Sequence, residues 1–190
     1  AEAAVMFMLM IVHHYNEAQE TLARGQLYLP MGDEVEDKVL GLIGFGASAK
    51  ALANLAKPLG MRLMIVEPRE IEPELLAEFQ PEYVGTPAAM DRIFCEADFI
   101  SLHLPLTPET KGIVTAEKIA MMKPTACFIN IARGDLVDQE ALYTALLENR
   151  IAGIGTDVHA GVRPDPKHAV YKDPRFYALP HVSGTTQGTV

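Results

Sequence analysis

A glycine-rich turn followed by an acidic residue is the part of this sequence best suited to binding a ligand. The apolar run Val39–Ile43 leads into the segment GFGASA, which begins at Gly44, and Glu67 follows about twenty residues later. Gly44 permits a tight turn, Gly46 lets the backbone approach a pyrophosphate, and Ala49 is small enough for close packing of a helix on a strand. The strand before the turn, the helix after it and the acid at this distance together predict a dinucleotide site.

The helix that leaves this turn is expected to begin at Ala47 and Ser48, where unpaired backbone N–H groups attract phosphate. Glu67 is predicted to accept hydrogen bonds from the adenosine ribose, and its charge repels a 2′-phosphate, which favours NAD over NADP. Arg69 lies two residues further on and could soften that preference. The alternative for Glu67 taken alone is a solvated acid at the end of a strand.

A second turn places an arginine after a strand in the segment NIARGDLVD, residues 130–138. Ligands of open α/β sheets bind at the carboxyl edge, where this turn is expected. The forked guanidinium of Arg133 is suited to a carboxylate or a polarised carbonyl because it can bind two oxygens at once. Asp138 is suited to capping the helix that follows. The alternative for Arg133 is a salt bridge to a neighbouring loop.

The elements that must position these residues alternate between strand and helix. Continuous apolar runs predict strands at 38–43, 62–66, 83–84, 98–103, 126–131, 151–156 and 177–182, and helical patterns at 1–24, 47–57, 73–79, 87–96, 115–122 and 138–149. Strands of this kind are typical of a parallel sheet covered by helices on both faces. The sequence therefore predicts an α/β fold with a doubly wound, Rossmann-type parallel sheet and an extra N-terminal helix, in one domain spanning 1–190.

Composition limits the classes of partner. The chain of 190 residues has a formal net charge of −9, which argues against a nucleic-acid backbone or an anionic membrane as the main partner. Cys95 and Cys127 are the only cysteines, and both are expected to be buried, reduced thiols in a cytoplasmic protein. The apolar run Ala3–Val12 is too short to span a bilayer. It is expected to be a core helix or, alternatively, a helix buried against a partner subunit or a second domain. We expect no metal site.

The sequence as a whole resembles the D-2-hydroxyacid dehydrogenase family, which includes D-lactate, phosphoglycerate and formate dehydrogenases. The resemblance spans nearly the whole chain in order. Its stretches are Ala1-Glu2-Ala3, the glycine turn, SLHLPLTPET at 101–110, Ala132-Arg133-Gly134, GIGTDV at 153–158 and PHVSG at 180–184.

The resemblance implies roles for particular residues. Arg133 looks like the catalytic arginine that orients the substrate, and His181 looks like the catalytic acid/base. Asp157 and the turn Ser183-Gly184 resemble positions that hold the nicotinamide end of the cofactor. Pro105, in the same motif as His103, resembles a residue that lines the cofactor cleft, and Ala132 belongs to the cofactor-binding stretch beside Arg133. A structural role for His103 is the open alternative.

The implied reaction transfers a hydride between nicotinamide and a small 2-hydroxy or 2-keto acid, with NAD as cofactor. Such enzymes pair through their cofactor domains, so a homodimer involving the apolar N-terminal helix is expected. The family also has a second, substrate-binding domain, which these residues do not contain, so low turnover is expected without it. The identity of the acid is not predicted.

Two departures from the family pattern leave alternatives open. The family usually has a glutamate five residues after the position of Asp157, where it supports the histidine, but this sequence has Val162 there. Asp165 could substitute for it. Formate dehydrogenases also lack that glutamate and share the tail His-x-Ser-Gly-Thr-Thr, so formate oxidation is one alternative, and a non-catalytic NAD-responsive binding module is another. Ala47-Ser48 also replaces an Arg-Ile pair, so a basic side chain that often supports the pyrophosphate is missing.

Overall fold

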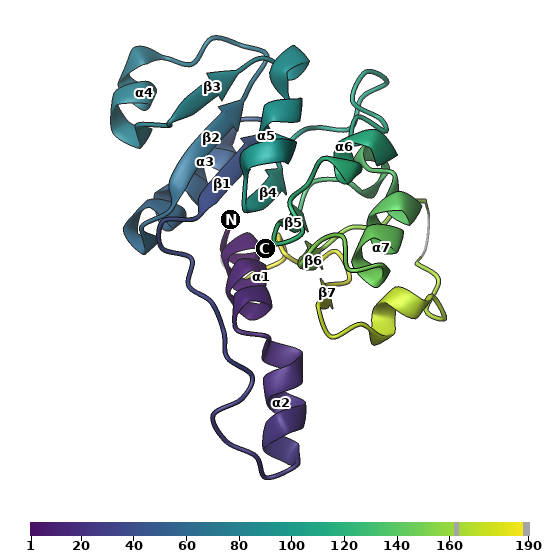
Figure 1. Ribbon diagram of the computed structural model, residues 1–190. Coiled ribbons are helices and arrows are strands. Elements are labelled where there is room, and N and C mark those ends of the chain that lie inside the picture. The colour runs from purple at the N-terminus through teal and green to yellow at the C-terminus, as the bar shows by residue number, and fades with distance from the viewer. Residues whose placement is uncertain (162–163, 188–190) are drawn as a thin grey trace.

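Seven parallel strands form one sheet in the order β3-β2-β1-β4-β5-β6-β7 in the computed structural model (Figure 1), which describes residues 1–161 and 164–187. The strands are β1 Val39–Ile43, β2 Arg62–Val66, β3 Tyr83–Gly85, β4 Phe99–Leu102, β5 Cys127–Asn130, β6 Gly153–Thr156 and β7 Phe176–Ala178. The order reverses between β1 and β4, as in a doubly wound sheet. The predicted fold class is therefore confirmed.

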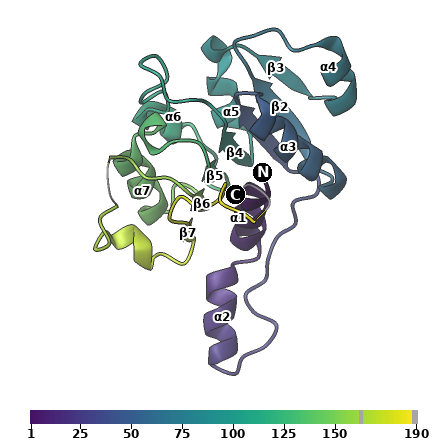
Figure 2. The same ribbon diagram turned by 180° about the vertical axis from the view of Figure 1, so that it is seen from behind.

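Helices cover both faces of this sheet, as the two opposite views show (Figures 1 and 2). The helices are α1 Glu2–Val12, α2 Tyr15–Ala23, α3 Ala47–Ala56, α4 Pro73–Phe79, α5 Asp91–Glu96, α6 Ala116–Ala120 and α7 Gln139–Leu147, with 3-10 turns η1 Lys57–Leu59, η2 Pro87–Ala89, η3 Gly134–Leu136 and η4 Ala169–Lys172. Apolar side chains of α5, α6 and α7 pack on one face, and those of α1, α3 and α4 pack on the other.

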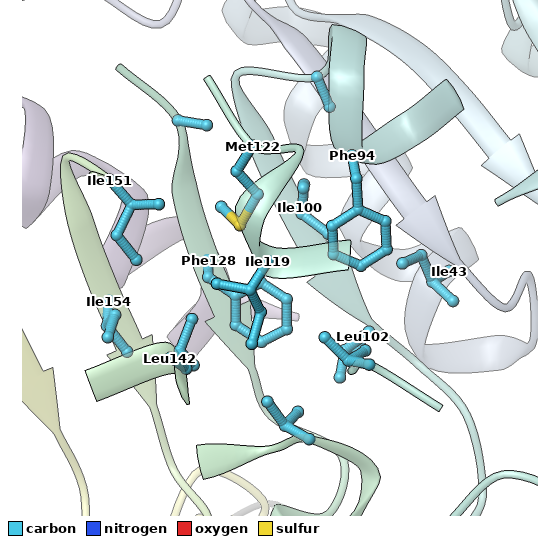
Figure 3. Close-up of a cluster of buried hydrophobic side chains, with 14 of the residues drawn as sticks. Ile43, Phe94, Ile100, Leu102, Ile119, Met122, Phe128, Leu142, Ile151 and Ile154 are labelled. Atoms are coloured by element: carbon cyan, nitrogen blue, oxygen red, sulfur yellow. The ribbon is translucent and has the colours of Figure 1, made fainter. Parts of the chain in front are cut away.

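Each face has its own hydrophobic core. Figure 3 shows the core under α5, α6 and α7, where Phe94, Ile119 and Leu142 from the helices meet Ile100 and Phe128 from the strands. These side chains are buried, and their burial is the main contribution to the stability of the sheet. Two rigid layers thereby hold the carboxyl ends of the strands, where the predicted site residues lie, in fixed relative positions.

The N-terminal helix was predicted as one element over residues 1–24, and this is wrong. The helix is interrupted at His13 and His14, and His14 adopts the left-handed conformation with a φ of 47°. The apolar helix α1 is buried against the sheet, which fits the core-helix expectation, whereas α2 is polar and projects with the following loop as an arm (Figure 2). The direction changes where the apolar pattern ends, because only α1 has a face to bury.

Several other boundaries differ from the predictions by a few residues. The last strand was expected at 177–182 but is only Phe176–Ala178, and the chain beyond it turns at Pro180 and His181.

Cys127 is buried as expected, but Cys95 is exposed. The reason is that the short helix α5 buries Ile93 and Phe94 and turns the next side chain outward.

The part of the chain that the structure describes has no helix that is both long and apolar enough to cross a membrane. Within the same residues, no three His, Cys, Asp or Glu side chains are grouped so that they could hold a metal ion.

Candidate functional site

The glycine turn joins β1 to α3 at the carboxyl edge of the sheet. Gly44 has a φ of +90°, and a Cβ there would lie 2.8 Å from the carbonyl oxygen of His103, so only glycine fits. Gly46 precedes α3 in ordinary extended backbone, and a Cβ built on it meets nothing within 4 Å. Gly46 thus leaves open space beside the helix start, which is where a ligand would come closest to the backbone.

The first turn of α3 offers hydrogen-bond donors to that space. The first backbone bond of the helix runs from Lys50 N–H to Gly46 O at 3.0 Å. The N–H groups of Ala47, Ser48 and Ala49 donate to no protein acceptor among the described residues. Together with the positive end of the helix dipole, these groups fit an anionic pyrophosphate.

Glu67 lies beside this helix start at the end of β2 and is only 7% exposed. Its two carboxylate oxygens accept hydrogen bonds from Phe45 N–H at 2.7 Å and from Arg69 Nε at 2.8 Å. Burial alone would raise the pKa of Glu67, but the hydrogen bonds from Arg69 and Phe45 outweigh it, so its pKa lies below the usual value. Glu67 is therefore an ionised, fixed acceptor that lines a cavity of about 290 Å³ together with Gly46 and Ala47.

His103 follows β4 and reaches the same helix start. Its Nδ1 lies 3.1 Å from Ser48 Oγ, and its Nε2 lies 3.0 Å from Ser101 Oγ. Burial lowers the pKa of His103 to about 3, so the ring is neutral throughout the physiological range. The backbone of His103 is fixed as well, because its N–H donates to Ile43 O at 2.8 Å.

The turn that carries Arg133 is held by a buried asparagine at the end of β5. Asn130 accepts a hydrogen bond from Ala132 N–H at 3.0 Å and donates from Nδ2 to Arg133 O at 2.9 Å. The Arg133 side chain is exposed, and its Nη1 donates to Ala132 O at 2.7 Å. The predicted cap is confirmed, since Asp138 accepts from Ala141 N–H at 3.0 Å. Arg133 thus presents a guanidinium without a carboxylate partner among the described residues.

The turn after His181 is held by Asp157, which follows β6 and is only 1% exposed. Its Oδ1 accepts from Val182 N–H at 2.8 Å, and its Oδ2 accepts from Ser183 N–H at 3.0 Å and from Ser183 Oγ. His181 itself is exposed and adopts a left-handed φ of 60°. A non-glycine residue in that region is uncommon and costs free energy, and such residues cluster at functional sites.

Close packing joins the Arg133 turn to the segment that follows Asp157. A Cβ on Gly134 would lie 2.0 Å from the carbonyl carbon of His159, so the two backbones are in direct contact. Ala160 N–H also donates to Gln139 Oε1 at 2.8 Å. The Arg133 turn and the segment that follows Asp157 are therefore parts of one rigid assembly, and Asp157 in turn holds the turn after His181.

An open cavity of about 580 Å³ lies against this assembly, and His159, Tyr171, Leu179, Pro180 and His181 are among its lining residues. It lies at the carboxyl edge of β6 and β7. Its position beside the His181 turn suits a small ligand that has to reach the imidazole.

The structure brings most of the predicted site residues to one edge of the sheet. Those positions are Gly44, Gly46, Ala47, Ser48, Glu67, His103, Ala132, Arg133, Asp157, His181 and Ser183, each at or just after the carboxyl end of a strand. Pro105 and Gly184 lie in the loops that continue from His103 and Ser183, and the Pro105 carbonyl accepts from Thr110 Oγ1 at 2.7 Å. Val162, which stands where the family usually has a glutamate, lies outside the described residues.

The sequence analysis missed three buried polar residues that shape this edge. Asn130 and Thr156 end β5 and β6, Ser101 is the last but one residue of β4, and each bonds the loop that follows its own strand. The available signal was a hydroxyl or amide side chain at or next to the end of an otherwise apolar strand. Such a group must find a partner when it is buried.

Comparison with known proteins shows which family the chain belongs to. Residues 5–183 match the family model described as "D-isomer specific 2-hydroxyacid dehydrogenase, NAD binding domain". The chain is 34% identical over 190 residues to a D-3-phosphoglycerate dehydrogenase of Synechocystis, covering 98% of this chain and 33% of the relative. It is 34% identical over 194 residues to the glyoxylate reductase/hydroxypyruvate reductase of Homo sapiens, covering 100% of this chain and 58% of the relative.

Solved structures agree. A glyoxylate reductase from Paecilomyes thermophila superimposes with a TM-score of 0.87 at 27% identity, covering 99% of this chain and 56% of that one. A D-lactate dehydrogenase with NAD+ from Lactobacillus jensenii gives a TM-score of 0.83 at 30% identity, covering 99% and 59%. The chain thus spans between a third and three fifths of the length of the proteins it matches.

Proposed function

The chain belongs to the D-isomer specific 2-hydroxyacid dehydrogenase family and is an NAD-binding domain of it, and we propose that it serves the transfer of hydride between NAD and a small 2-hydroxy or 2-keto acid. The observation that carries the proposal is the assembly of two turns, one presenting Arg133 and the other His181, at the sheet edge that also holds the glycine turn. Residues 1–190 are proposed to form one cofactor domain that works with a separate substrate-binding domain.

The residues at the glycine turn fit the cofactor. The free N–H groups of Ala47, Ser48 and Ala49 would hold the pyrophosphate, and the open side of Gly46 leaves it room. Glu67 would accept from the adenosine ribose, since each of its oxygens retains a lone pair beside its protein hydrogen bond. The nicotinamide ring, when bound, supplies or accepts the hydride. We propose that the Asp157-held turn at Ser183 and Gly184, with Ala132 and Pro105, borders that ring.

Arg133 and His181 are proposed to act on the acid. The exposed guanidinium of Arg133 binds the substrate carboxylate with two parallel hydrogen bonds and orients the adjacent carbonyl. The imidazole of His181 gives a proton to the carbonyl oxygen during reduction and takes it back during oxidation. The cavity beside His181 has room for such a substrate. The names of the relatives make glyoxylate and hydroxypyruvate the first substrates to test.

Formate oxidation is the second candidate. It is supported by the tail from His181 to Thr186 and by Val162 at the position of the family glutamate. NADH formation that depends on formate, with no reduction of glyoxylate, would favour it. If a protein that also contains the substrate-binding domain catalyses neither reaction but binds NAD tightly, that result would instead favour a binding module.

Binding of NAD to the folded chain is expected to raise its melting temperature by roughly 5–10 °C at about a hundredfold excess over Kd. NADP is expected to raise it less, because its 2′-phosphate meets the ionised Glu67. Glu67→Gln removes the charge but keeps an acceptor for Phe45 N–H, so it should narrow the gap between the two cofactors. Differential scanning calorimetry with each cofactor measures the gap.

Glu70→Gln is the matched control, because Glu70 lines the same cavity but is exposed and should leave the gap unchanged. Equal narrowing by both variants would mean that the general negative potential, and not Glu67, discriminates against NADP. No thermal shift with NAD or NADH would refute cofactor binding.

The arm formed by α2 and the following loop is proposed to pair two copies of the chain into a homodimer. Leu27, Tyr28, Leu29 and Met31 form an exposed apolar patch on this arm, with Tyr28 96% and Met31 86% exposed. Patches of this kind mark protein interaction sites. The apolar helix α1, expected to supply the interface, already buries Phe7, Met8 and Ile11 within its own chain. The burial of α1 within its own chain therefore supports the arm, and not α1, as the proposed interface.

Simultaneous replacement of Tyr28 and Met31 by serine is expected to convert the dimer to a monomer without changing the melting curve of the monomer, because neither side chain is part of a core. Sedimentation velocity measures the change. Leu147→Ser, at an apolar surface residue of α7 that is 40% exposed, should leave the dimer intact. A monomeric unsubstituted chain, or a dimer that survives the double substitution, would rule out pairing through the arm.

A further inference from the structure

A buried hydroxyl near the end of β4 has one hydrogen-bond partner in the part of the chain that the structure describes. Ser101 is 0% exposed, and among the described residues its Oγ contacts one polar atom, His103 Nε2 at 3.0 Å. A buried hydroxyl carries one proton, and leaving that proton without an acceptor costs the desolvation of the group. Ser101 therefore donates to Nε2, which must be the unprotonated nitrogen of the ring.

The protonation of the other ring nitrogen follows. His103 is neutral because burial holds its pKa at about 3, and a neutral imidazole has one N–H. With Nε2 as acceptor, that N–H is on Nδ1, and it donates to Ser48 Oγ at 3.1 Å. Ser48 Oγ is thereby an acceptor towards His103, and its own proton is available for another partner.

Ser48 lies where such a partner would be. It is the second residue of α3, it is exposed, and its neighbours Ala47 and Ala49 also have free backbone N–H groups. The opposite tautomer of His103 would turn the Ser48 proton inward towards Nδ1 and leave the Ser101 proton buried without an acceptor. Only the Nδ1–H tautomer gives the buried Ser101 hydroxyl an acceptor and leaves the proton of the exposed Ser48 hydroxyl directed outward.

We propose that Ser101, His103 and Ser48 form a relay that fixes the Ser48 hydroxyl as a hydrogen-bond donor to the cofactor pyrophosphate, in place of the basic side chain absent from this turn. Ser48 is the contact residue, and Ser101 and His103 are positioning residues. The glycine turn is built around the relay, because Gly44 packs directly on the His103 carbonyl. The proposal rests on the proposed binding of NAD, but the tautomer of His103 is a property of the free protein.

A double-mutant cycle on NADH affinity tests the relay. Ser48→Ala removes a hydrogen bond to a charged group and is expected to raise Kd about tenfold. Ser101 lies in β4 and does not contact the pyrophosphate site. Ser101→Ala is expected to raise Kd about threefold, because the ring of His103 then adopts both tautomers and the Ser48 hydroxyl points its proton at the pyrophosphate only part of the time. In the Ser48→Ala background, Ser101→Ala should have no further effect. Isothermal titration calorimetry measures all four proteins.

Cys127→Ala is the matched control for a small truncation inside the sheet. Cys127 is buried on β5 and has no part in the relay, so this variant should bind NADH as the unsubstituted chain does. Adenosine, which lacks phosphate, should bind equally well to every variant. Additive effects of the two serine substitutions, or an equal loss of adenosine affinity, would overturn the proposal.

The tautomer supplies a readout that does not involve the cofactor. In ¹⁵N NMR of the free protein, His103 should show a protonated Nδ1 and an unprotonated Nε2, and Ser101→Ala should shift the ring towards a mixture of tautomers. A protonated Nε2 in the unsubstituted chain would overturn the relay even if NADH binds. A chain with the expected tautomer that does not bind NADH would instead contradict the proposed function.

Discussion

In a protein that also contains the proposed substrate-binding domain, replacing His181 with asparagine is expected to lower the rate of NADH-dependent glyoxylate reduction by about 10³-fold, the usual contribution of a general acid. The affinity for NADH should stay unchanged, because the glycine turn and Glu67 are untouched. Asparagine is the informative replacement because residue 181 has a φ of 60°, a conformation that asparagine adopts more readily than most residues. The variant removes the proton donor while keeping the turn that Asp157 holds.

The control for this substitution is another histidine in the same backbone conformation. His14 has a φ of 47° between α1 and α2, away from the sheet edge, and His14→Asn should leave the rate unchanged. The decrease of NADH absorbance measures the reaction rate, and calorimetric titration measures the Kd for NADH. Equal rates for His181→Asn and the unsubstituted protein would remove His181 from the reaction, and a parallel loss of NADH affinity would show that it only supports the cofactor.

The sequence was most informative where a short segment determines its own conformation. The glycine turn could be predicted because Gly44 needs a positive φ, a continuous apolar run before it defines a strand, and a helical pattern follows it. The Asp138 cap was predicted correctly for the same reason, since its contact is three residues away. Strand boundaries at β2 and the helix α4 were also as predicted. For the glycine turn and the Asp138 cap, the deciding interaction is local in the chain.

Contacts between distant segments could not be predicted from the sequence. Nothing near Ser48 in the chain indicates that His103 reaches it, because that contact depends on β4 lying beside β1. The break at His14 and the exposure of Cys95 likewise follow from which faces the sheet leaves open. The family resemblance supplied candidate roles for Arg133 and His181, but the packing that joins their turns was visible only in three dimensions.

That packing predicts a large effect of a single methyl group. Gly134→Ala is expected to lower the free energy of unfolding by about 3 kcal/mol or more, at the upper end of overpacking substitutions. The added Cβ would lie 2.0 Å from both the carbonyl carbon and the oxygen of His159 and 2.4 Å from Ala160 N, and backbone atoms cannot move aside as a flexible side chain can. Urea denaturation followed by circular dichroism measures the loss. An unfolding free energy within 1 kcal/mol of the unsubstituted value would contradict this contact.

Gly46→Ala is the matched comparison because it adds the same methyl group in open space. Gly46 has ordinary extended dihedral angles, and its Cβ would meet nothing within 4 Å, so stability should change by about 1 kcal/mol at most. Its NADH affinity should fall sharply, since the methyl group occupies the side from which the pyrophosphate approaches. The two alanine variants therefore separate two uses of glycine in this fold. At Gly134 the missing side chain lets the Arg133 turn pack on the backbone of His159, and at Gly46 it leaves room for the cofactor.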